Sequence, residues 1–283
     1  MNLLELRSNL TAIPFELGIP FAVYTVGTEN QPLMTRLEGF SANQWFLTFS
    51  GTGSFRFLGE DNWSLVPPGT LLYIPSGLPH EYGPHGSDPW IIGYVTFMEQ
   101  ADGFLAHLGC GNQFFRAELQ DVNRPYELLS AIWQHSGPQY NAWRTSEHFF
   151  AFCLEIKKQT KAGNSDKPTA DSAQTARYPH SVVHHATRYM QDHLQRNITV
   201  AELSAHVGYS SKQLTRLFRE SLDTTPLQYL QRIRLQAAAL LLEQHPHMTI
   251  RQTAAHVGME PVYFTRLFRR MFGVVPSKLR ASK

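Results

Sequence analysis

Apolar residues in the first hundred positions come in short runs separated by glycine, proline, asparagine and aspartate. Such runs, when rich in aromatic and β-branched side chains and bounded by turn residues, are typical of β-strands. Several short strands at close spacing predict a small β-barrel or a jelly roll. The predicted strands are residues 21–26, 44–49, 54–58, 70–74 and 90–97.

Two later segments, residues 124–133 and 146–158, show the three-to-four-residue apolar spacing of amphipathic helices. The stripe on the second helix either packs against the outer face of the strands or contacts a second copy of the chain. That stripe consists of Phe149, Phe150, Cys153, Leu154 and Lys157. Residues 161–179 contain almost no large apolar residue, which is typical of a flexible linker.

The remaining part of the chain contains an internal repeat with a period of 50 residues. Residues 206–230 and 256–280 align without a gap and share His-Val-Gly, Thr-Arg-Leu-Phe-Arg and a proline. A solenoid needs at least three repeats. Two copies therefore indicate one small motif that is used twice.

Each copy has the pattern of two helices joined by a glycine turn, which is a helix-turn-helix. Gly208 and Gly258 predict the end of the first helix, where a left-handed residue is needed, and Pro261 fits the first turn of a second helix. Capping boxes satisfy free amides at a helix start. Three pairs have the required spacing: Thr199 with Glu202, Thr249 with Gln252, and Ser210 with Gln213.

One face of each second helix predicts contact with DNA. In the major groove, Arg and Lys contact guanine or phosphate and Gln contacts adenine. Arg216 and Arg266 are the strongest single candidates. The predicted DNA-contacting residues are Ser211, Lys212, Gln213, Thr215, Arg216 and Arg219 in the first copy, and Val262, Tyr263, Thr265, Arg266 and Arg269 in the second.

The segment between the copies, residues 226–244, contains no glycine and no proline after its first residue. It predicts one continuous helix of roughly 28 Å. Two recognition helices about 34 Å apart meet successive major-groove faces on one side of a duplex. The sequence therefore predicts that a rigid spacer sets the separation of the two motifs.

Charge is distributed unevenly along the chain. From His180 onward there are 14 Lys and Arg against 6 Asp and Glu, a charge of +8, whereas the preceding part carries −6, for a total of +2. An acidic front and a basic back indicate that only the back meets a polyanion. Basic surfaces are often merely solvated, but the paired helix-turn-helix motifs favour DNA.

The overall composition, with 42% hydrophobic and 17% charged residues, is that of a soluble protein. Cys110 and Cys153 lack the spacing of a metal site and suggest a reducing compartment. Glu5 and Arg7 come too early for a signal peptide, and there is no run of 18 apolar residues. We therefore expect a cytoplasmic protein without a membrane partner.

Residues 180–283 resemble the DNA-binding domain of the AraC/XylS family of bacterial transcription regulators. The resemblance rests on the two helix-turn-helix motifs, on Arg-Ile-Arg-Leu-Gln-Ala-Ala at residues 232–238, and on Phe-Gly-x-x-Pro-Ser-x-x-Arg at residues 272–280. Pro261 and Val262 stand where many members carry polar base-reading residues. In the front part, Gly-x5-Pro-x-Gly-x2-His at residues 69–80 resembles the second motif of cupin barrels, and its surroundings resemble the effector domain of the same family.

The resemblance implies an α+β protein. Residues 1–160 would form a cupin-like β-barrel with a helical appendage for effector binding and dimerisation, residues 161–179 a flexible linker, and residues 180–283 an all-α domain with two helix-turn-helix motifs joined by a linker helix. The implied function is sequence-specific transcription regulation, as an activator controlled by a small-molecule effector, expected to be a sugar. The implied partners are double-stranded DNA, the effector, RNA polymerase and a second copy of the chain.

A metal-dependent cupin enzyme and a protein-interaction module are the alternatives. The enzyme needs several imidazoles and a carboxylate around one ion, but no histidine precedes His80, and His80 with His85 supplies at most two nitrogens. An interaction module does not account for the basic back part or the spaced repeat. We therefore expect no metal, no cofactor and no catalysis.

The resemblance also implies an effector pocket inside the barrel, with residues up to about Pro20 as a lid. Arg36 and Tyr82 occupy positions that contact the sugar in an arabinose-binding member, whereas Ile92 and Tyr94 replace a His and a Trp there. We therefore expect a sugar-like pocket with altered specificity.

Five further side chains are effector-site candidates with a structural alternative. His80 either bonds the backbone at a strand end or contacts the ligand. The four aromatic side chains either stack on a sugar ring or pack in the core. They are Tyr24, Trp45, Tyr73 and Trp90.

Overall fold

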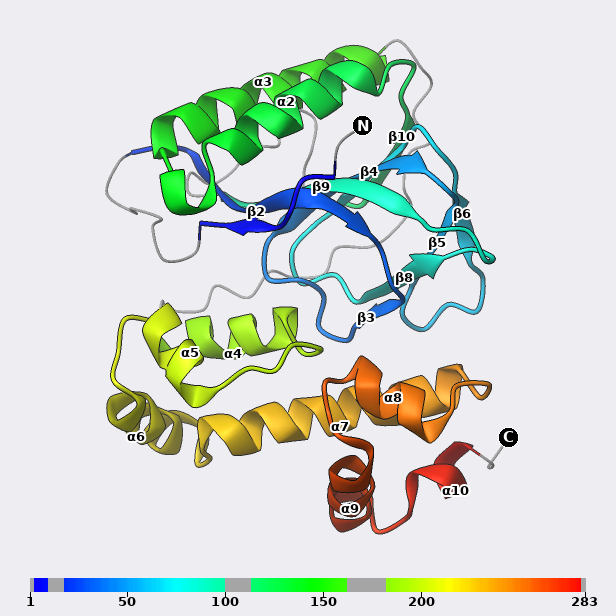
Figure 1. The fold of residues 1–283 in the computed structure, drawn as a ribbon, viewed down its shortest axis with the longest axis vertical. Coiled ribbons are helices and arrows are strands. Elements are labelled where there is room, and N and C mark those ends of the chain that lie inside the picture. Colours follow the sequence, from blue (N-terminus) through cyan, green and yellow to red (C-terminus); the bar gives the residue numbers. More distant parts are fainter. Residues whose placement is uncertain (1–2, 10–17, 100–112, 162–181, 281–283) are drawn as a thin grey trace. The chain divides into compact units, whose positions relative to one another are not determined.

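The computed structural model describes residues 3–9, 18–99, 113–161 and 182–280. The chain divides into two compact units, residues 1–175 and 176–283 (Figure 1). The predicted linker lies outside the described residues from residue 162 onward, and so do residues 10–17 of the predicted lid and Cys110.

The five predicted strands are all present in the N-terminal unit, together with short strands that the periodicity did not indicate. In its described part, the strands form a six-stranded sheet with the order β1-β2-β9-β4-β7-β10 and a four-stranded sheet with the order β3-β8-β5-β6. The strands are β1 Arg7–Ser8, β2 Phe21–Asn30, β3 Met34–Arg36, β4 Asn43–Ser50, β5 Gly53–Phe57, β6 Ser64–Val66, β7 Thr70–Ile74, β8 His80–Pro84, β9 Ile91–Glu99 and β10 Phe115–Glu118.

These two antiparallel sheets share no strand and are not closed into a barrel. The prediction of a closed barrel is therefore wrong. The alternative prediction, a jelly roll, agrees with the two separate sheets because a jelly roll is a double sheet. The α+β fold class, with strands in front and helices behind, is confirmed.

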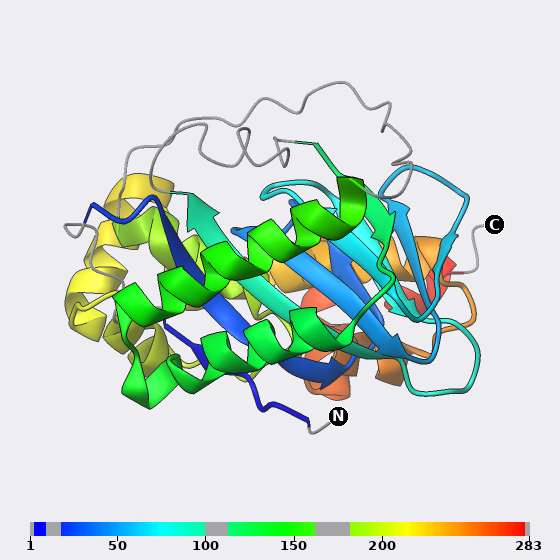
Figure 2. The same ribbon diagram turned by 90° about the horizontal axis from the view of Figure 1, so that it is seen from above.

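Two helices cover the outer face of the six-stranded sheet, where Figure 2 shows them side by side across β2, β9 and β4. They are α2 Asn123–Gln134 and α3 Ala142–Lys161, with the 3-10 turn η1 Gly137–Gln139 between them. The predicted stripe on α3 is divided between two faces. Phe149 and Cys153 are buried against the sheet, whereas Phe150 and Leu154 are exposed.

The C-terminal unit is helical throughout its described part. Its helices are α4 Val182–Asp192, α5 Val200–His206, α6 Ser211–Leu222, α7 Pro226–Gln244, α8 Ile250–His256, α9 Pro261–Phe272 and α10 Pro276–Arg280. The pairs α5–α6 and α8–α9 are the two predicted helix-turn-helix motifs, and α7 is the predicted spacer. No helix in the described ranges is long and apolar enough to cross a membrane.

Capping explains where these helices begin. Ser210 and Gln213 form the predicted capping box of α6, and Thr249 and Gln252 form that of α8. Thr199 caps α5 with its hydroxyl alone. The carboxylate of Glu202, its predicted partner, accepts a hydrogen bond of 2.8 Å from the Tyr189 hydroxyl instead. A fourth box, Thr225 with Gln228, starts α7 and was not predicted.

The spacer helix is anchored to the end of α4 by a buried arginine. Arg234 donates hydrogen bonds from Nε to the Leu194 carbonyl at 3.0 Å and from Nη2 to the Arg196 carbonyl at 2.5 Å. Burial lowers the pKa of its guanidinium. The Arg-Ile-Arg motif therefore has a structural role, because its second arginine satisfies two carbonyls of the turn that follows α4.

The two turn glycines, although equivalent in the repeat, have different surroundings. Both have positive φ, +74° at Gly208 and +67° at Gly258. A Cβ at Gly208 would meet nothing within 4 Å, whereas a Cβ at Gly258 would lie 2.7 Å from the carbonyl oxygens of Leu194 and Gln195.

We therefore predict that Gly258→Ala destabilises the protein more than Gly208→Ala. Gly208→Ala adds only the strain of a left-handed alanine, about 1–2 kcal/mol. Gly258→Ala adds a clash with backbone atoms and costs about 1–3 kcal/mol more. Denaturant unfolding of the full chain measures both changes, and equal losses would contradict the contact between Gly258 and the end of α4.

Candidate nucleic-acid interface

The second helix of each motif presents one exposed face, which we call its reading face. On α6 this face consists of Ser211, Lys212, Gln213, Thr215, Arg216 and Arg219, which line one shallow concavity. On α9 it consists of Pro261, Val262, Thr265, Arg266 and Arg269, which line another together with Val275. Tyr263 is the one predicted DNA-contacting residue that does not line either concavity.

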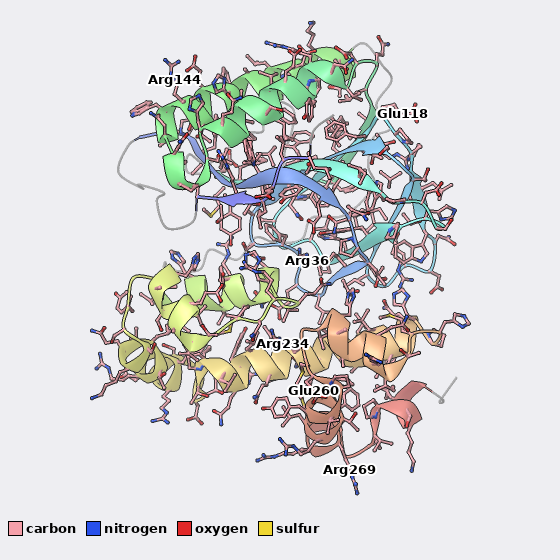
Figure 3. The ribbon with its side chains drawn as sticks, viewed as in Figure 1. Arg36, Glu118, Arg144, Arg234, Glu260 and Arg269 are labelled. Carbon is pink, nitrogen blue, oxygen red and sulfur yellow. The ribbon has the colours of Figure 1, made fainter. Side chains whose placement is uncertain are left out.

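All four reading-face arginines are exposed. The side chain of Arg216 is 69% exposed, and its ion pair with Glu220 at 3.6 Å is a weak surface pair. Arg219, Arg266 and Arg269 are exposed as well, and Figure 3 shows Arg269 pointing away from α7. The cationic groups are therefore free to meet a polyanion.

Several polar groups on the α6 face already have partners. The amide oxygen of Gln213 accepts hydrogen bonds from the Ser210 amide at 3.1 Å and the Ser210 hydroxyl at 2.8 Å. The Thr215 hydroxyl donates to the Ser211 carbonyl at 2.8 Å. Bidentate recognition of adenine needs both ends of a Gln amide. Gln213 can provide it only by releasing the cap of α6.

Polar groups near the start of α9 are engaged to a greater extent. The carboxylate of Glu260 accepts hydrogen bonds from the Val262 and Tyr263 amides, which lowers its pKa. The Tyr263 hydroxyl accepts from Gln231 of α7 at 2.5 Å, and the Thr265 hydroxyl donates to the Pro261 carbonyl at 2.9 Å. Of these partners, Glu260 and Gln231 were not singled out by the sequence pattern.

The two reading helices lie at different ends of the spacer. Figure 1 shows α6 beside the N-terminal end of α7 and α9 beneath its C-terminal half. The 19 residues of α7 span roughly 28 Å as a helix. A spacing of one DNA turn between α6 and α9 stays a prediction.

In the N-terminal unit, the predicted effector residues separate into two groups. Tyr82, Ile92 and Tyr94 lie between the two sheets. His80 joins them, since its ring stacks on Tyr82 at 5.4 Å and on Phe55 at 5.6 Å. Burial raises the pKa of the Tyr94 hydroxyl, so this interior contains uncharged polar groups.

Tyr24 and Arg36 lie together near Phe40. The ring of Tyr24 is 5.9 Å from that of Phe40, and the guanidinium carbon of Arg36 lies 5.0 Å from the centre of the same ring. Arg36 also contributes to the lowered pKa of His80. Arg36 therefore lies close to the interior defined by His80, whereas Tyr24 packs with Phe40 and Ala42 in a separate cluster.

Trp45 and Tyr73 lie on the opposite face of the six-stranded sheet. Their rings are 4.8 Å apart and pack in the core under α2 and α3. Side chains alternate between faces along a strand, and Phe46 and Leu72, their neighbours in sequence, point to the inter-sheet side. Trp45 and Tyr73 therefore do not share the interior with His80 and Tyr82.

Trp90 has a structural role between the sheets. Its Nε1 donates a hydrogen bond of 3.1 Å to the Thr48 hydroxyl. Its ring lies against Gly53, where an added Cβ would come within 2.2 Å of it. The contact accounts for the glycine at the start of β5.

The two nitrogens of His80 have different environments. Its Nδ1 lies 2.6 Å from the Leu78 carbonyl oxygen, and its buried Nε2 has no hydrogen-bond partner among the residues that the structure describes. Burial lowers the pKa of the ring to about 3. A carbonyl only accepts hydrogen bonds, so Nδ1 carries the proton and Nε2 is a free acceptor.

In the described ranges, no three His, Cys, Asp or Glu side chains are grouped so that they could hold a metal ion. Residues 203–282 match the family described as a helix-turn-helix domain, and residues 35–152 match the AraC-like ligand binding domain. These matches cover the two helix-turn-helix motifs and most of the two-sheet unit. The chain belongs to the AraC/XylS family of transcription regulators. It is a DNA-binding regulator and not an enzyme.

Curated relatives agree with this assignment. The lactose operon transcription activator of Staphylococcus xylosus is 21% identical over 239 residues, which are 83% of this chain and 78% of the relative. The arabinose operon regulatory protein of Escherichia coli is 27% identical over 219 residues, 73% of this chain and 68% of the relative.

Two solved structures are also similar to the chain. ToxT from Vibrio cholerae covers 92% of this chain and 96% of its own length, at 15% identity and a TM-score of 0.32. The DNA-binding domain of AdpA, solved in complex with a target DNA, covers 35% of this chain and 90% of its own length, at 29% identity and a TM-score of 0.34.

We predict that Arg216→Ala weakens binding to a specific site by about 1–3 kcal/mol if the guanidinium contacts a base. A side chain that contacts only phosphate would instead weaken binding to all duplexes equally and lower the salt slope by about one. Binding titrations at several salt concentrations, on selected and random duplexes, distinguish the two. Arg251→Ala is the matched control, because it removes the same charge from an exposed position outside both reading faces.

Proposed function

We propose that this regulator binds DNA as a homodimer and responds to a small, uncharged polyhydroxy effector, such as a sugar, between the two sheets of its N-terminal unit. The observation that carries the proposal is the Nε2 of the buried His80, which accepts no hydrogen bond from any described residue. A buried acceptor without a partner costs free energy, so it favours a ligand that donates a hydrogen bond. A sugar hydroxyl does so.

The neighbouring side chains support the same ligand chemistry. Tyr82 and Tyr94 bring hydroxyl groups to the same interior, and Arg36 lies near His80. Neutral hydroxyls suit a neutral polyol, and aromatic rings suit the apolar face of a sugar. The names of two relatives, a lactose operon activator and an arabinose operon regulator, agree with a sugar effector and with activation.

A homodimer is supported by the outer face of α3. Trp143 and Leu154 are 63% and 46% exposed, and Phe150 remains 38% exposed although its ring stacks on that of Phe21 at 6.5 Å. Their spacing of seven and four residues places all three on one side of the helix. The opposite side, which includes Phe149 and Cys153, packs on the sheet of the same chain. The packing interpretation of the α3 stripe applies to this inner face, and we propose that a second copy of the chain covers the outer one.

Regulation follows if the effector has different affinities for two arrangements of the two units. Binding then changes the populations of these arrangements, and with them the way the dimer presents four reading helices to DNA. We propose that the favoured arrangement recruits RNA polymerase and activates transcription. An in vitro transcription assay with and without the effector tests this step.

We predict that His80→Phe removes effector binding and preserves the fold. Phenylalanine keeps a ring between Phe55 and Tyr82 but lacks the Nε2 acceptor. In a thermal-shift screen of the full chain against neutral monosaccharides, polyols and carboxylic acids, one of the first two groups should raise the Tm of the wild type only. A shift by carboxylic acids alone would contradict the proposal.

The same argument predicts the pH dependence of binding. His80 has a lowered pKa of about 3, so its ring is neutral above that pH and gains a proton only below it. An ordinary histidine titrates between about pH 5 and 8. Because His80 stays neutral over this range, its protonation should not lower the effector affinity there. Isothermal titration across this range measures it.

We predict that Leu154→Lys weakens the dimer about tenfold or more, because a desolvated ammonium replaces an apolar contact. Analytical ultracentrifugation of the full chain measures the dissociation constant. Leu65→Lys is the matched control, since Leu65 is 48% exposed but lies in β6, away from α3. If both variants dimerise like the wild type, α3 does not form the interface.

A further inference from the structure

The side chain of Val262 is exposed to solvent and does not contribute to the hydrophobic core. Its side chain is 77% exposed, more than any other large apolar side chain named in the described parts of the chain. It is the second residue of α9, where valine is a weaker helix former than most residues. Lys212 takes the equivalent place on α6, so the two copies of the motif differ at this position.

Hydrogen-bonding groups around Val262 are already engaged within the protein. The Glu260 carboxylate covers the first free amides of α9, Gln231 donates to the Tyr263 hydroxyl, and the Thr265 hydroxyl donates to the Pro261 carbonyl. Pro261 has no amide hydrogen. The leading part of the α9 reading face therefore presents methyl and ring carbons, and its exposed cations, Arg266 and Arg269, lie further along the helix.

The apolar surface is continuous with this cationic one. Val262, Pro261, Thr265 and Val275 line the same concavity as the two arginines. Helix α9 spans 12 residues and follows the glycine turn of a helix-turn-helix, so this face is the one such a motif places in the major groove. Within that groove, the apolar group on base edges is the C5-methyl of thymine.

We propose that α9 recognises thymine methyl groups through Val262 and the methyl group of Thr265, while α6 recognises hydrogen-bonding groups through Lys212 and Arg216. This inference rests on the proposal that both reading faces contact DNA. The two motifs of one chain then require different base sequences, despite their repeat, and the half-site of one chain is asymmetric. The helix caps add to this difference between the two motifs. The cap of α6 is the neutral Ser210, whereas the cap of α9 is the Glu260 carboxylate, whose negative charge repels a DNA phosphate at the start of that helix.

The test compares thymine with deoxyuridine, which lacks only the C5-methyl group. Duplexes selected by the full chain from a random pool are remade with deoxyuridine at one thymine at a time. We expect about fourfold weaker binding at one or two positions, the effect of one buried methyl. Val262→Ala should bind the thymine duplex about as weakly as the wild type binds the deoxyuridine duplex, and should not distinguish the two.

Lys212→Ala is the matched control. It should weaken binding overall and keep the wild-type preference for thymine at those positions. Because Val262 is exposed and alanine is a better helix former, Val262→Ala should melt at the wild-type temperature or above.

Three outcomes would overturn the inference. The first is a wild type that tolerates deoxyuridine at every position, and the second is an unchanged thymine preference in Val262→Ala. The third is loss of transcription activation by Val262→Ala with unchanged DNA affinity, because Val262 would then contact a protein partner. If the chain selects no sequence from the pool, sequence-specific DNA binding fails first and the inference falls with it.

Discussion

The continuity of α7 is the constraint on which the DNA-binding unit depends. Nineteen residues without an internal glycine or proline join the two helix-turn-helix motifs, so any bend in α7 would move one reading face relative to the other. Contacts along its length fix both ends of this arrangement. Arg234 binds the Leu194 and Arg196 carbonyls in the turn after α4, and Gln231 binds the Tyr263 hydroxyl of α9. Gly258 lets the second turn approach the same end of α4.

The repeat shows how one motif can keep its fold and change its chemistry. Buried positions are equivalent, with Leu214 and Phe218 on α6 matching Phe264 and Phe268 on α9, all without exposed surface. Exposed positions are free to diverge because packing does not constrain them. The cap has changed from serine to Glu260 and the leading surface residue from lysine to valine, while the arginines that follow are retained.

In the N-terminal unit, the alternation of side chains along each strand separates two sets of aromatic rings. One set fills the core under α2 and α3, and the other, with His80, lies between the sheets. The hydrogen bond from His80 to the Leu78 carbonyl fixes the position of its proton and leaves the second nitrogen as an acceptor. One backbone carbonyl therefore determines which tautomer the histidine adopts.

Local signals in the sequence were enough to locate the five main strands, the paired motifs and the spacer helix. These signals are capping residues, turn glycines and apolar periodicity, and each acts over a few neighbouring residues. The sequence could not assign Trp45 and Tyr73 to one face, since an aromatic run looks the same on either side of a sheet until its register is known. Nor could it show that Glu202 would bind Tyr189 rather than cap α5, or that Gly258, unlike Gly208, would approach the turn after α4. Those outcomes depend on contacts between residues far apart in the chain, and only the tertiary structure decides them.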